Sequence, residues 1–461
     1  MRIPIPDDIL PADRLGAVHL IGIGGAGLSA IARLLHQQGV AVSGSDGADS
    51  AVVAALRAEG ITVFVGHAAE QLGDAETVIA STAVREDNPE IVEAQRRGLR
   101  LWPRSAGLQS ILLGGRTVAV AGTHGKTTTT AMLTCALRAA GADPSFAIGA
   151  EVPSLDTNAS RGSGDVIVAE ADESDGAFLV YTPHGAIVTN VDPDHLDQWG
   201  TDEAYHAAFA EFVGHASDFV VLAADDPGAA QLAPHVRSRV LTAGFHDAAD
   251  LRGTDLAVTA TGTTFVARHE QGSVAVTLAV TGEHYAVDAL LALGAGVSLG
   301  HDLDDLARGL ADYTGAARRM QHLGDAGGVR VYDSYAHHPT EIAADLAAAR
   351  AIAGDDRLVV AYQPHLVSRT RRHGVAMGEA LSAADRVVVA DLYLAREDPD
   401  PAVTSALVVD AVDGPEASLG GPVVGLADVL VDVVRPGDLL LTLGAGDVTT
   451  VGPALLERLD P

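Results

Sequence analysis

The segment from Thr117 to Thr130 constrains the fold more strongly than any other part of the chain. Its apolar, β-branched residues Val118–Ala121 predict a buried strand, Gly122 and Gly125 predict a tight turn, and residues 127–138 predict a helix. A strand, a glycine-rich turn and a helix in this order form a phosphate cradle, because backbone N–H groups and the positive end of the helix face the anion. The segment therefore predicts an α/β domain that binds a nucleoside triphosphate.

Lys126 is the only lysine among the 30 lysines and arginines of the chain. A drift in composition towards arginine explains why lysine is scarce, but not why the remaining lysine stands in this turn. Here its compact ammonium can reach the β- and γ-phosphates, and the hydroxyl of Thr127 can bind Mg²⁺. The usual phosphate-loop pattern would place its first glycine at Val120, so the loop is a shortened form, and an ordinary strand-to-helix turn is the alternative. The predicted ATP-binding residues of the loop are Gly122, Thr123, His124, Gly125, Lys126, Thr127 and Thr128.

Length and composition exclude several classes of protein. The chain has 461 residues, which is too many for one hydrophobic core and is typical of about three domains. Its net charge of −31, without any run of Lys or Arg, argues against a protein that coats nucleic acid or an anionic membrane. The N-terminus lacks a signal-peptide pattern and no apolar run reaches ~18 residues, so we expect a soluble cytoplasmic protein. The single cysteine, Cys135, excludes an intrachain disulfide and is expected in the core.

Strand and helix patterns alternate along the chain, which predicts the α/β fold class with three doubly wound units. Runs rich in Thr and Val between residues 237 and 281 predict a small antiparallel appendage. Strands are expected at residues 17–23, near 40, 61 and 78, and at 118–121, 166–169, 186–189, 219–223, 329–332, 358–362, 386–390 and 439–443. We predict a Rossmann-like N-terminal domain (1–107), a central P-loop ATPase domain with a mostly parallel sheet and the appendage (108–316), and a Rossmann-like C-terminal domain (317–461).

The first unit carries a dinucleotide-binding fingerprint, Gly22-Ile-Gly-Gly-Ala-Gly27, and an acid, Asp46, at the end of its second predicted strand. This pattern predicts a diphosphate at a helix N-terminus and a carboxylate on a ribose hydroxyl. NAD fits the pattern, but a nucleotide sugar such as a UDP derivative fits it equally well, because the same groups bind any diphosphate. The predicted contacts are Gly24, Gly25, Ala26, Gly27 and Asp46.

Candidate metal ligands follow two predicted strands of the second unit. Carboxyl ends of parallel strands are where ligands bind in α/β sheets, oxygen ligands suit Mg²⁺, and a neutral imidazole can complete such a shell. Solvated acidic loops are the alternative in a chain with 61 acidic residues. The first group is Glu170, Asp172, Glu173 and Asp175, and the second is Asn190, Asp192, Asp194, His195 and Asp197.

Taken together, the motifs of the chain resemble those of the Mur ligase family over nearly its whole length. The phosphate loop is shared by the wider family, including folylpolyglutamate synthases, whereas the nucleotide-sugar loop and Tyr-Ala-His-His-Pro are narrower signals. The motifs are Gly22–Gly27, Gly44-Ser-Asp46, Ser81 to Val84 with Asn88-Pro-Glu90, Gly122–Thr127, Glu170-Ala-Asp-Glu173, Asn190 with Asp194-His195, Tyr335–Glu341, Gln363-Pro-His365 with Ser368-Arg-Thr370, and Gly444-Ala-Gly-Asp447.

The resemblance implies a three-domain, ATP-dependent amide ligase of peptidoglycan synthesis. By this resemblance the substrates are UDP-N-acetylmuramate at the N-terminal domain, ATP with Mg²⁺ at the central domain and L-alanine at the C-terminal domain, which closes over the site. The sugar's lactyl carboxylate attacks the γ-phosphoryl of ATP to give an acyl phosphate, and the amine of alanine then expels phosphate. Because two anions must meet, the site has to supply positive charge.

The resemblance also assigns residues. The implied catalytic residues are Lys126, Glu170, His195, Arg318 and Arg319, and the implied metal ligands are Thr127, Glu170 and His195. Further implied contacts are Asn190, His284, Asp288 and Asp333 for ATP, Ser81 and Asn88 for the UDP-sugar, and Tyr335, His337, His338 and Arg369 for the amino-acid end.

The chain departs from the family pattern at three places. Family members often carry two acids before the tyrosine, whereas the pair here is Asp333-Ser334. Asp288 stands where the family usually has the second asparagine of its adenine motif, and a carboxylate cannot donate to adenine N7. Leu366 stands where an arginine often follows Gln-Pro-His. Because no second lysine exists, relatives that bridge a second metal with a carbamylated lysine are disfavoured.

Three alternative functions stay open at this point. They are a murein tripeptide ligase that acts on the same sugar, an NAD-dependent oxidoreductase, and a nucleotide-switch protein without ligase turnover. We expect a monomer or weak dimer with no nucleic-acid partner and no membrane insertion.

Overall fold

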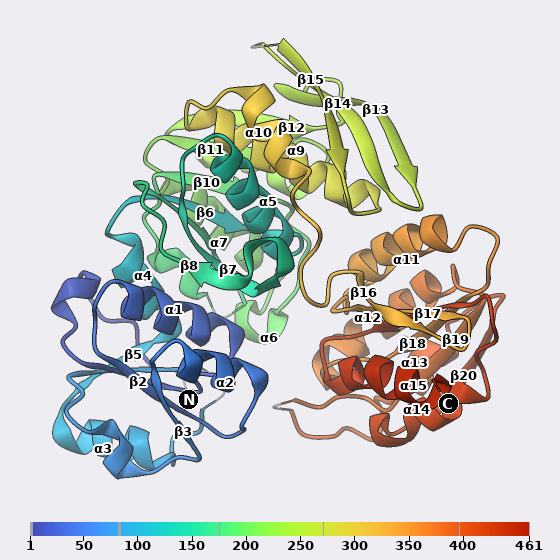
Figure 1. Ribbon diagram of the computed structural model, residues 1–461, viewed down its shortest axis with the longest axis horizontal. Helices are drawn as coiled ribbons and strands as arrows, with labels where there is room; N and C mark the ends of the chain where they lie inside the picture. The colour runs from blue at the N-terminus through green and yellow to red at the C-terminus, as the bar shows by residue number, and fades with distance from the viewer. Residues whose placement is uncertain (1–2, 82–83, 175, 271, 396, 461) are drawn as a thin grey trace. The chain divides into compact units, whose positions relative to one another are not determined.

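The computed structural model describes residues 3–81, 84–174, 176–270, 272–395 and 397–460. Three sheets organise the chain (Figure 1). In the part of the chain that the structure describes, every helix is too short or too polar to cross a membrane. The chain forms two compact units, one of Met1–Arg252, Ala267–Val274 and Asp288–Leu310, the other of Gly253–Val266, Ala275–Val287 and Ala311–Pro461.

The N-terminal sheet is parallel throughout, with the strand order β3-β2-β1-β4-β5. Every residue of β1 (Val18–Ile21) and β4 (Thr77–Ala80) is buried, as expected for parallel strands covered on both faces. The strand order reverses between β1 and β4, so their carboxyl ends flank the crevice where this topology binds ligands. The doubly wound first unit is confirmed. Its other elements are β2 (Val42–Asp46), β3 (Thr62–Val65), β5 (Arg100–Pro103), α1 (Ala26–Gln37), α2 (Ala51–Ala58), α3 (Pro89–Arg97) and α4 (Arg104–Leu112).

The central sheet has β6 (Arg116–Ala121) between two parallel neighbours, β9 (Val166–Glu170) and β10 (Gly185–Val188). Its parallel part starts at β13 (Leu251–Thr259) and has the order β13-β12-β11-β10-β6-β9-β7, and β8 pairs antiparallel with β7. The phosphate loop thus leaves the middle of this sheet. The other elements are β7 (Ser145–Val152), β8 (Thr157–Ser160), β11 (Phe219–Ala223), β12 (Arg239–Gly244), α5 (Lys126–Ala139), α6 (Leu196–Trp199), α7 (Asp202–Gly214), α8 (Pro227–Ala230), α9 (Glu283–Ser298) and α10 (Leu303–Leu310).

The antiparallel appendage consists of β13 (Leu251–Thr259), β14 (Gly262–His269) and β15 (Gly272–Leu278), which continue the sheet beyond β12. Each connection between them has two residues, which is too short for a parallel crossover, so the strands alternate in direction. The appendage begins later than predicted. The segment of β12 was assigned to it, but β12 pairs in parallel with β11, because a Thr- and Val-rich composition favours a strand without fixing its direction.

The third sheet has the order β16-β17-β21-β18-β19-β20 and is parallel except for the β16–β17 pair. Side chains of β18 (Leu358–Tyr362) alternate between two buried clusters, one under α11 and α12 and the other under α14 and α15 (Figure 1). The other elements are β16 (Gln321–Ala326), β17 (Val329–Ser334), β19 (Arg386–Ala390), β20 (Glu416–Gly421), β21 (Leu439–Leu443), α11 (Pro339–Ala353), α12 (Val367–Leu381), α13 (Ala406–Val409), α14 (Val423–Val431) and α15 (Val451–Leu459). Short 3₁₀ helices span Ala12–Arg14, Ala69–Leu72, Pro153–Leu155, Ala177–Val180, Ala233–His235 and Asp447–Thr450.

Candidate functional site

The predicted phosphate loop joins β6 to α5, and two of its positions require glycine. Gly122 has φ = 140° and Gly125 has φ = 80°. A Cβ atom on Gly122 would lie 1.9 Å from Oγ1 of Thr189, and one on Gly125 would lie 2.6 Å from Oδ1 of Asp288. Helix α5 begins directly after Gly125, so its first N–H groups lie at the loop, as the phosphate cradle needs.

The ammonium of Lys126 is held by the loop and by one carboxylate. Its Nζ donates to the carbonyl oxygens of Gly122 (2.6 Å) and Thr123 (3.1 Å) and to Oε2 of Glu173 (2.8 Å). Burial alone would lower the pKa of Lys126, but the charges of Glu173 and Asp172 outweigh it and raise the pKa above its ordinary value. The amine therefore stays protonated at neutral pH and places one positive charge at the start of α5.

The segment after β10 braces this loop. Asn190 uses both ends of its amide on His124: Oδ1 accepts from the backbone N–H (2.9 Å) and Nδ2 donates to the carbonyl (3.1 Å). The Thr123 hydroxyl donates to the carbonyl of Asp192 (2.9 Å) and lies 2.8 Å from the buried Tyr205 hydroxyl. The loop is thus held in one conformation by side chains from two other segments, which keeps its N–H groups directed towards a ligand.

Glu173 and His195 form the next part of the site. Glu173 is buried, and Nε2 of His195 lies 3.8 Å from its Oε1. Within the described residues this Oε1 accepts no hydrogen bond. His195 has φ = 52°, in the left-handed region, and its backbone N–H donates to Oδ1 of Asp194 (2.8 Å). A non-glycine residue held in this region costs ~1–3 kcal/mol, and such strain is concentrated at functional sites.

The other predicted carboxylates have different partners. Oε1 of Glu170 accepts from the backbone N–H of Gly149 (2.5 Å), and Oδ2 of Asp172 accepts from Nη2 of Arg104 (2.7 Å). Burial would raise the pKa of Asp172, but the charges of Arg104 and Lys126 hold it well below its usual range. Asp175 and the side chain of Asp197 lie outside the described residues. Of the carboxylates that the structure describes, Glu173 is the one bonded to Lys126.

The predicted sugar-binding residues surround an open cavity of about 730 Å³ at the carboxyl ends of β1 and β4. The predicted residues that line it are Gly24, Gly25, Asp46, Ser81 and Asn88. Ala26 and Gly27 follow at the start of α1. Asp46 already accepts two backbone hydrogen bonds, from Gly24 to its Oδ2 (2.8 Å) and from Ala48 to its Oδ1 (3.1 Å), so the carboxylate also holds the glycine loop in place.

A buried carboxylate lies close to this cavity, that of Glu90, which belongs to a motif named from the sequence but was assigned no role there. Glu90 accepts from Ser45 Oγ (2.6 Å), and its oxygens lie 3.2 Å from His19 Nε2 and 3.0 Å from His67 Nδ1. Burial would raise the pKa of Glu90, but these bonds and the charge of His19 lower it, so the carboxylate stays ionised. His67 lines the cavity and is an added candidate for the sugar site. No motif marks it, because it follows β3 in an ordinary Val-Gly-His turn.

In the compact unit that contains the C-terminal sheet, four aromatic or imidazole rings and one guanidinium lie close together after β17, β18 and β19. The rings of Tyr335 and His337 pack edge to face with their centroids 5.3 Å apart, and the ring centroids of His337 and His365 are 6.2 Å apart. His365 stacks on Tyr393 at 5.4 Å, and its Nδ1 lies 3.2 Å from Nη1 of Arg369. The structure therefore brings together three residues predicted for the amino-acid end and adds His365 and Tyr393 to them.

The two predicted arginines both lie against Tyr335. The guanidinium carbons of Arg318 and Arg319 lie 4.8 and 5.1 Å from its ring centre. Nε of Arg318 lies 3.4 Å from the buried Asp333, and its Nη2 donates to the carbonyls of Gly444 and Gly446. Arg318 has φ = 59°. Arg318 therefore links the segment before β16 to β17 and to the loop after β21, and the Asp333 carboxylate holds its side chain in place.

His338 and His284 have contacts of different kinds. His338 is the N-cap residue of α11, and its ring lies 4.9 Å from that of His373. Nε2 of His284 lies 3.9 Å from Oδ1 of Asp345 on α11, and burial lowers the pKa of His284 to about 4. The imidazole is therefore neutral at physiological pH. Its predicted contact with ATP stays a prediction, as does that of Asp288.

Asp345 gives a prediction on stability. Burial raises its pKa from 3.8 to about 7, although the hydrogen bond from Ser334 acts in the opposite direction. The folded state therefore prefers the protonated acid, and wild-type stability is lost as pH rises from about 4 to about 7. We expect Asp345→Asn to stabilise α11, with a gain larger at pH 8 than at pH 5.5 by about 2 kcal/mol.

Hydrogen exchange of the α11 amides at the two pH values measures this gain. Asp355→Asn, in the loop after α11, is the control, and it should leave the exchange of the α11 amides nearly unchanged at both pH values. An equal effect of Asp345→Asn at pH 5.5 and pH 8 would contradict the raised pKa.

The predicted site residues thus fall into two groups. One group lies in the compact unit that contains the central sheet, around the start of α5. It consists of the loop from Gly122 to Thr128, with Thr127 and Thr128 buried in the first turn of the helix, and of Asn190, Glu173 and His195. In the compact unit that contains the C-terminal sheet, Arg318 and Arg319 lie against Tyr335, and Asp333 pairs with Arg318. His337 and His365 connect Tyr335 to Arg369. Glu173 was seen as one of several acids, but the spacing could not single it out.

Comparisons with known proteins agree along the whole chain. Residues 17–116 match the model of the Mur ligase family catalytic domain, residues 120–296 that of the Mur ligase middle domain, and residues 318–446 that of the Mur ligase glutamate ligase domain.

The sequence is similar to the UDP-N-acetylmuramate–L-alanine ligase of Nocardioides sp., with 58% identity over 467 residues and 100% of both chains covered. The structure is similar to that of the UDP-N-acetylmuramate-alanine ligase of Thermotoga maritima, with a TM-score of 0.82, 30% identity, and 96% of this chain and 98% of that chain covered. A murein peptide ligase of Psychrobacter arcticus shares the fold, with a TM-score of 0.74, 23% identity and the same coverage.

Proposed function

The chain belongs to the Mur ligase family, and from this premise we propose that it is an ATP-dependent ligase that joins L-alanine to the lactyl carboxylate of UDP-N-acetylmuramate. ADP and phosphate are the other products, and the reaction is a step of peptidoglycan synthesis. The observation that carries the proposal is the Lys126 ammonium, fixed at the start of α5 between two loop carbonyls and Glu173. The similarity to alanine-adding ligases over the full length supports the choice of substrates.

The alternatives are less well supported. Among solved structures, the murein peptide ligase has 23% identity and a TM-score of 0.74, against 30% and 0.82 for the alanine ligase of Thermotoga maritima. An NAD-dependent oxidoreductase would leave the phosphate loop and the whole central domain without a role. A nucleotide switch would not need the cavity of about 730 Å³ at the glycine fingerprint, which has room for a sugar nucleotide.

The chemistry of the proposed reaction requires two anions to react. The lactyl carboxylate oxygen attacks the γ-phosphorus of ATP, the bond to the β,γ-bridging oxygen breaks, and ADP leaves with the electron pair. The amine of alanine then attacks the acyl carbon, phosphate leaves, and the amine loses a proton. Lys126 would neutralise charge on the transferred phosphoryl group, and the N–H groups at the start of α5 would bind the phosphates.

The residues around Lys126 also fit a magnesium ion. A buried carboxylate oxygen without a hydrogen bond in the described residues, Oε1 of Glu173, is a ready ligand, and the hydroxyl of Thr127 and the imidazole of His195 are its proposed companions. Glu170 stays a proposed ligand from the family resemblance. When bound, the ion would screen the charges of the phosphates. The chain's part is to hold these donors, and the strained backbone of His195 fixes its ring beside Glu173.

The cluster around Tyr335 fits the amino-acid end of the reaction. Arg369 is buried and lies beside His365, so its guanidinium can bind the carboxylate of alanine without a large loss of side-chain entropy. Its neighbours His337 and Tyr393 would limit the space for the amino-acid side chain. Arg318 and Arg319 would add positive charge when the C-terminal domain closes on the substrates.

The remaining assignments are proposals of the same kind. We assign residues 1–107 to the sugar nucleotide, 108–316 to ATP and 317–461 to the amino acid. The substrates ATP and a UDP-sugar favour the cytoplasm as the place of action. A monomer or weak dimer stays our expectation for the oligomeric state.

One assay separates these functions. Phosphate release is measured with ATP and UDP-N-acetylmuramate, with alanine, glycine, serine, the murein tripeptide or no amine added. Release that depends on alanine supports the proposal. Release with the tripeptide but not with alanine would indicate the tripeptide ligase, and release that needs neither sugar nor amine would indicate a nucleotide switch.

His195→Ala tests the metal site. We expect the Mg²⁺ concentration for half-maximal activity to rise by about tenfold or more, because the ring would no longer hold the ion beside Glu173. The measurement is a Mg²⁺ titration of phosphate release at saturating substrates. His235→Ala, at an exposed position of the same unit, should leave the titration unchanged. An unchanged titration in His195→Ala would contradict the assignment of His195 to the metal.

A further inference from the structure

A buried asparagine of the central sheet is bonded to the helix that starts at the sugar-binding loop. Asn158 lies on β8 and is 1% exposed. Its Nδ2 donates to the carbonyl of Ala26 (3.0 Å) and to Oγ of Ser29 (3.3 Å). Ser29 Oγ itself donates to the same Ala26 carbonyl (3.0 Å). Ala26 is the first residue of α1, directly after the glycine loop, so β8 holds the end of α1 that faces the sugar nucleotide.

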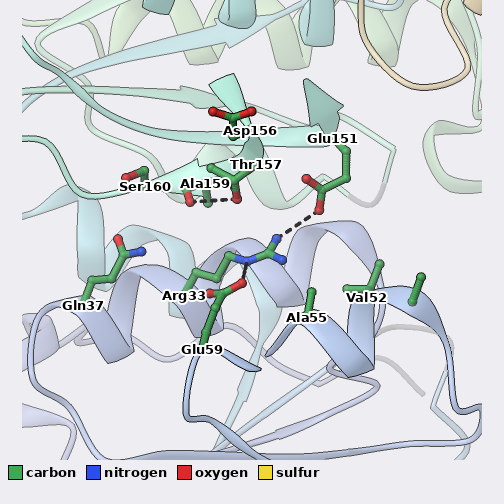
Figure 2. Close-up of a pocket in the computed structure, with 11 residues that line it drawn as sticks. Arg33, Gln37, Val52, Ala55, Glu59, Glu151, Asp156, Thr157, Ala159 and Ser160 are labelled. Carbon is green, nitrogen blue, oxygen red and sulfur yellow. Dashed lines mark hydrogen bonds and ion pairs between the residues drawn. The ribbon is translucent and has the colours of Figure 1, made fainter. Parts of the chain in front are cut away.

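An arginine on the same helix completes this junction. Arg33 is 3% exposed, and its Nη1 donates to Oδ1 of Asn158. Figure 2 shows its guanidinium between Glu59, at the end of α2, and Glu151, on the facing strand β7, with N···O distances of 2.8 and 3.1 Å. Removing a partner from a buried charge is strongly unfavourable, so α1 cannot slide along the central sheet without breaking this set of bonds.

The sheet connects this junction to the phosphate loop. Ala159, next to Asn158, pairs with Ala147 of β7, and Ala147 pairs with Ala169 of β9. Ala169 pairs with Ala119 of β6, the strand that leads into the phosphate loop. One row of backbone pairing therefore joins the residue beside Asn158 to β6, the strand that leads into the loop of Lys126. All of these residues belong to one compact unit.

We propose that Asn158 and Arg33 are positioning residues, which fix the bound UDP-sugar at the distance from ATP that the first step needs. The inference rests on the proposed function. Neither side chain contacts the reacting groups, and both act by holding the start of α1. A displacement of about 1 Å between reacting groups can reduce a rate by about 100-fold, so the bonds of this junction matter for the rate more than for binding.

The test compares the rate constant with the two affinities. In Asn158→Ala we expect kcat for alanine-dependent phosphate release to fall about tenfold or more. The Kd values of UDP-N-acetylmuramate and of ATP, measured separately by calorimetry, should each change by less than about threefold, because each substrate contacts mainly one domain. A merely structural role would lower the folded fraction and leave kcat per binding-competent site unchanged. The stoichiometry of ATP binding gives that fraction.

Two further variants sharpen the result. Asn158→Asp keeps an acceptor for Arg33 but loses the donor to the Ala26 carbonyl. A fall in kcat as large as that of Asn158→Ala supports positioning through α1. A normal kcat in Asn158→Asp overturns the proposal. Ser29→Ala removes the longer hydrogen bond of Asn158 to α1 and should lower kcat by less than Asn158→Ala does. This variant also tests the proposal if the Asn158 variants do not fold. Normal kcat in this variant, with Asn158→Ala unfolded, overturns the proposal.

The matched control is Arg161→Ala. Arg161 meets Gln37 across the same junction but is exposed, so its kcat should stay within about twofold of wild type. A fall in kcat matched by an equal rise in a Kd would overturn the inference. Failure of the proposed function would be seen separately, as a wild-type protein that does not release phosphate on addition of alanine.

Discussion

Lys126→Arg is expected to lower the rate of ligation by about 100- to 1000-fold while the protein still folds. The ammonium makes three short contacts, with the carbonyls of Gly122 and Thr123 and with Glu173. A planar, longer guanidinium cannot direct donors to all three from the start of α5. Burial on its own favours the neutral amine, and the nearby carboxylates keep it charged, so the position is built around this one compact charge.

Phosphate release with saturating substrates measures the loss, and circular dichroism and thermal unfolding check the fold. Arg138→Lys, at the last turn of the same helix, is the matched exchange between the two cations and should retain nearly full activity, because its guanidinium packs over Phe146 at the opposite end of the helix from the loop. Near-normal turnover in Lys126→Arg would contradict the proposed role of the ammonium.

The sequence predicted much of the fold because parallel strands buried on both faces are nearly continuous apolar runs. The strands at 219–223, 358–362, 386–390 and 439–443 were predicted with the bounds of β11, β18, β19 and β21. The phosphate loop and the glycine fingerprint were found for a related reason. Their function depends on local backbone conformation, and glycine at a fixed spacing is a direct record of that conformation.

The parts that sequence reasoning missed depend on contacts between distant segments. Strand β8 has only four residues, and the second half of β7 is partly exposed, so no long apolar run marks either strand. Their importance lies in Asn158, whose partners on α1 are more than 100 residues away in the chain. Composition likewise suggested an antiparallel β12, because residue types do not record which neighbour a strand pairs with.

The choice between Glu170 and Glu173 shows the same limit within one motif. Glu170 is the last residue of β9 and Glu173 follows it by three positions, and the family resemblance led to the first of them. The path of the chain after the strand turns Glu173 into the core beside Lys126, whereas the Glu170 carboxylate accepts from Gly149. Only the three-dimensional structure distinguishes the two, and the experiment that decides between them has a large expected effect.

Glu173→Gln is expected to reduce kcat/KM by about 100-fold or more, and to raise the Mg²⁺ requirement. The amide can still accept a hydrogen bond from Lys126, but it has no charge to oppose the ammonium and is a poorer ligand for a hard cation. Its volume is almost the same, so packing in this buried position is kept. The effect therefore reports charge and metal binding and not a cavity.

The comparison variant is Glu170→Gln, which carries the same chemical change three residues earlier. If Glu173 is the main ligand, Glu170→Gln should lose no more than about tenfold in kcat/KM, since its carboxylate already has a backbone partner in Gly149. A larger loss in Glu170→Gln than in Glu173→Gln, with the larger shift in the Mg²⁺ titration, would return the metal to Glu170. In that case Glu173 would serve only as the counter-ion that keeps Lys126 charged before ATP arrives.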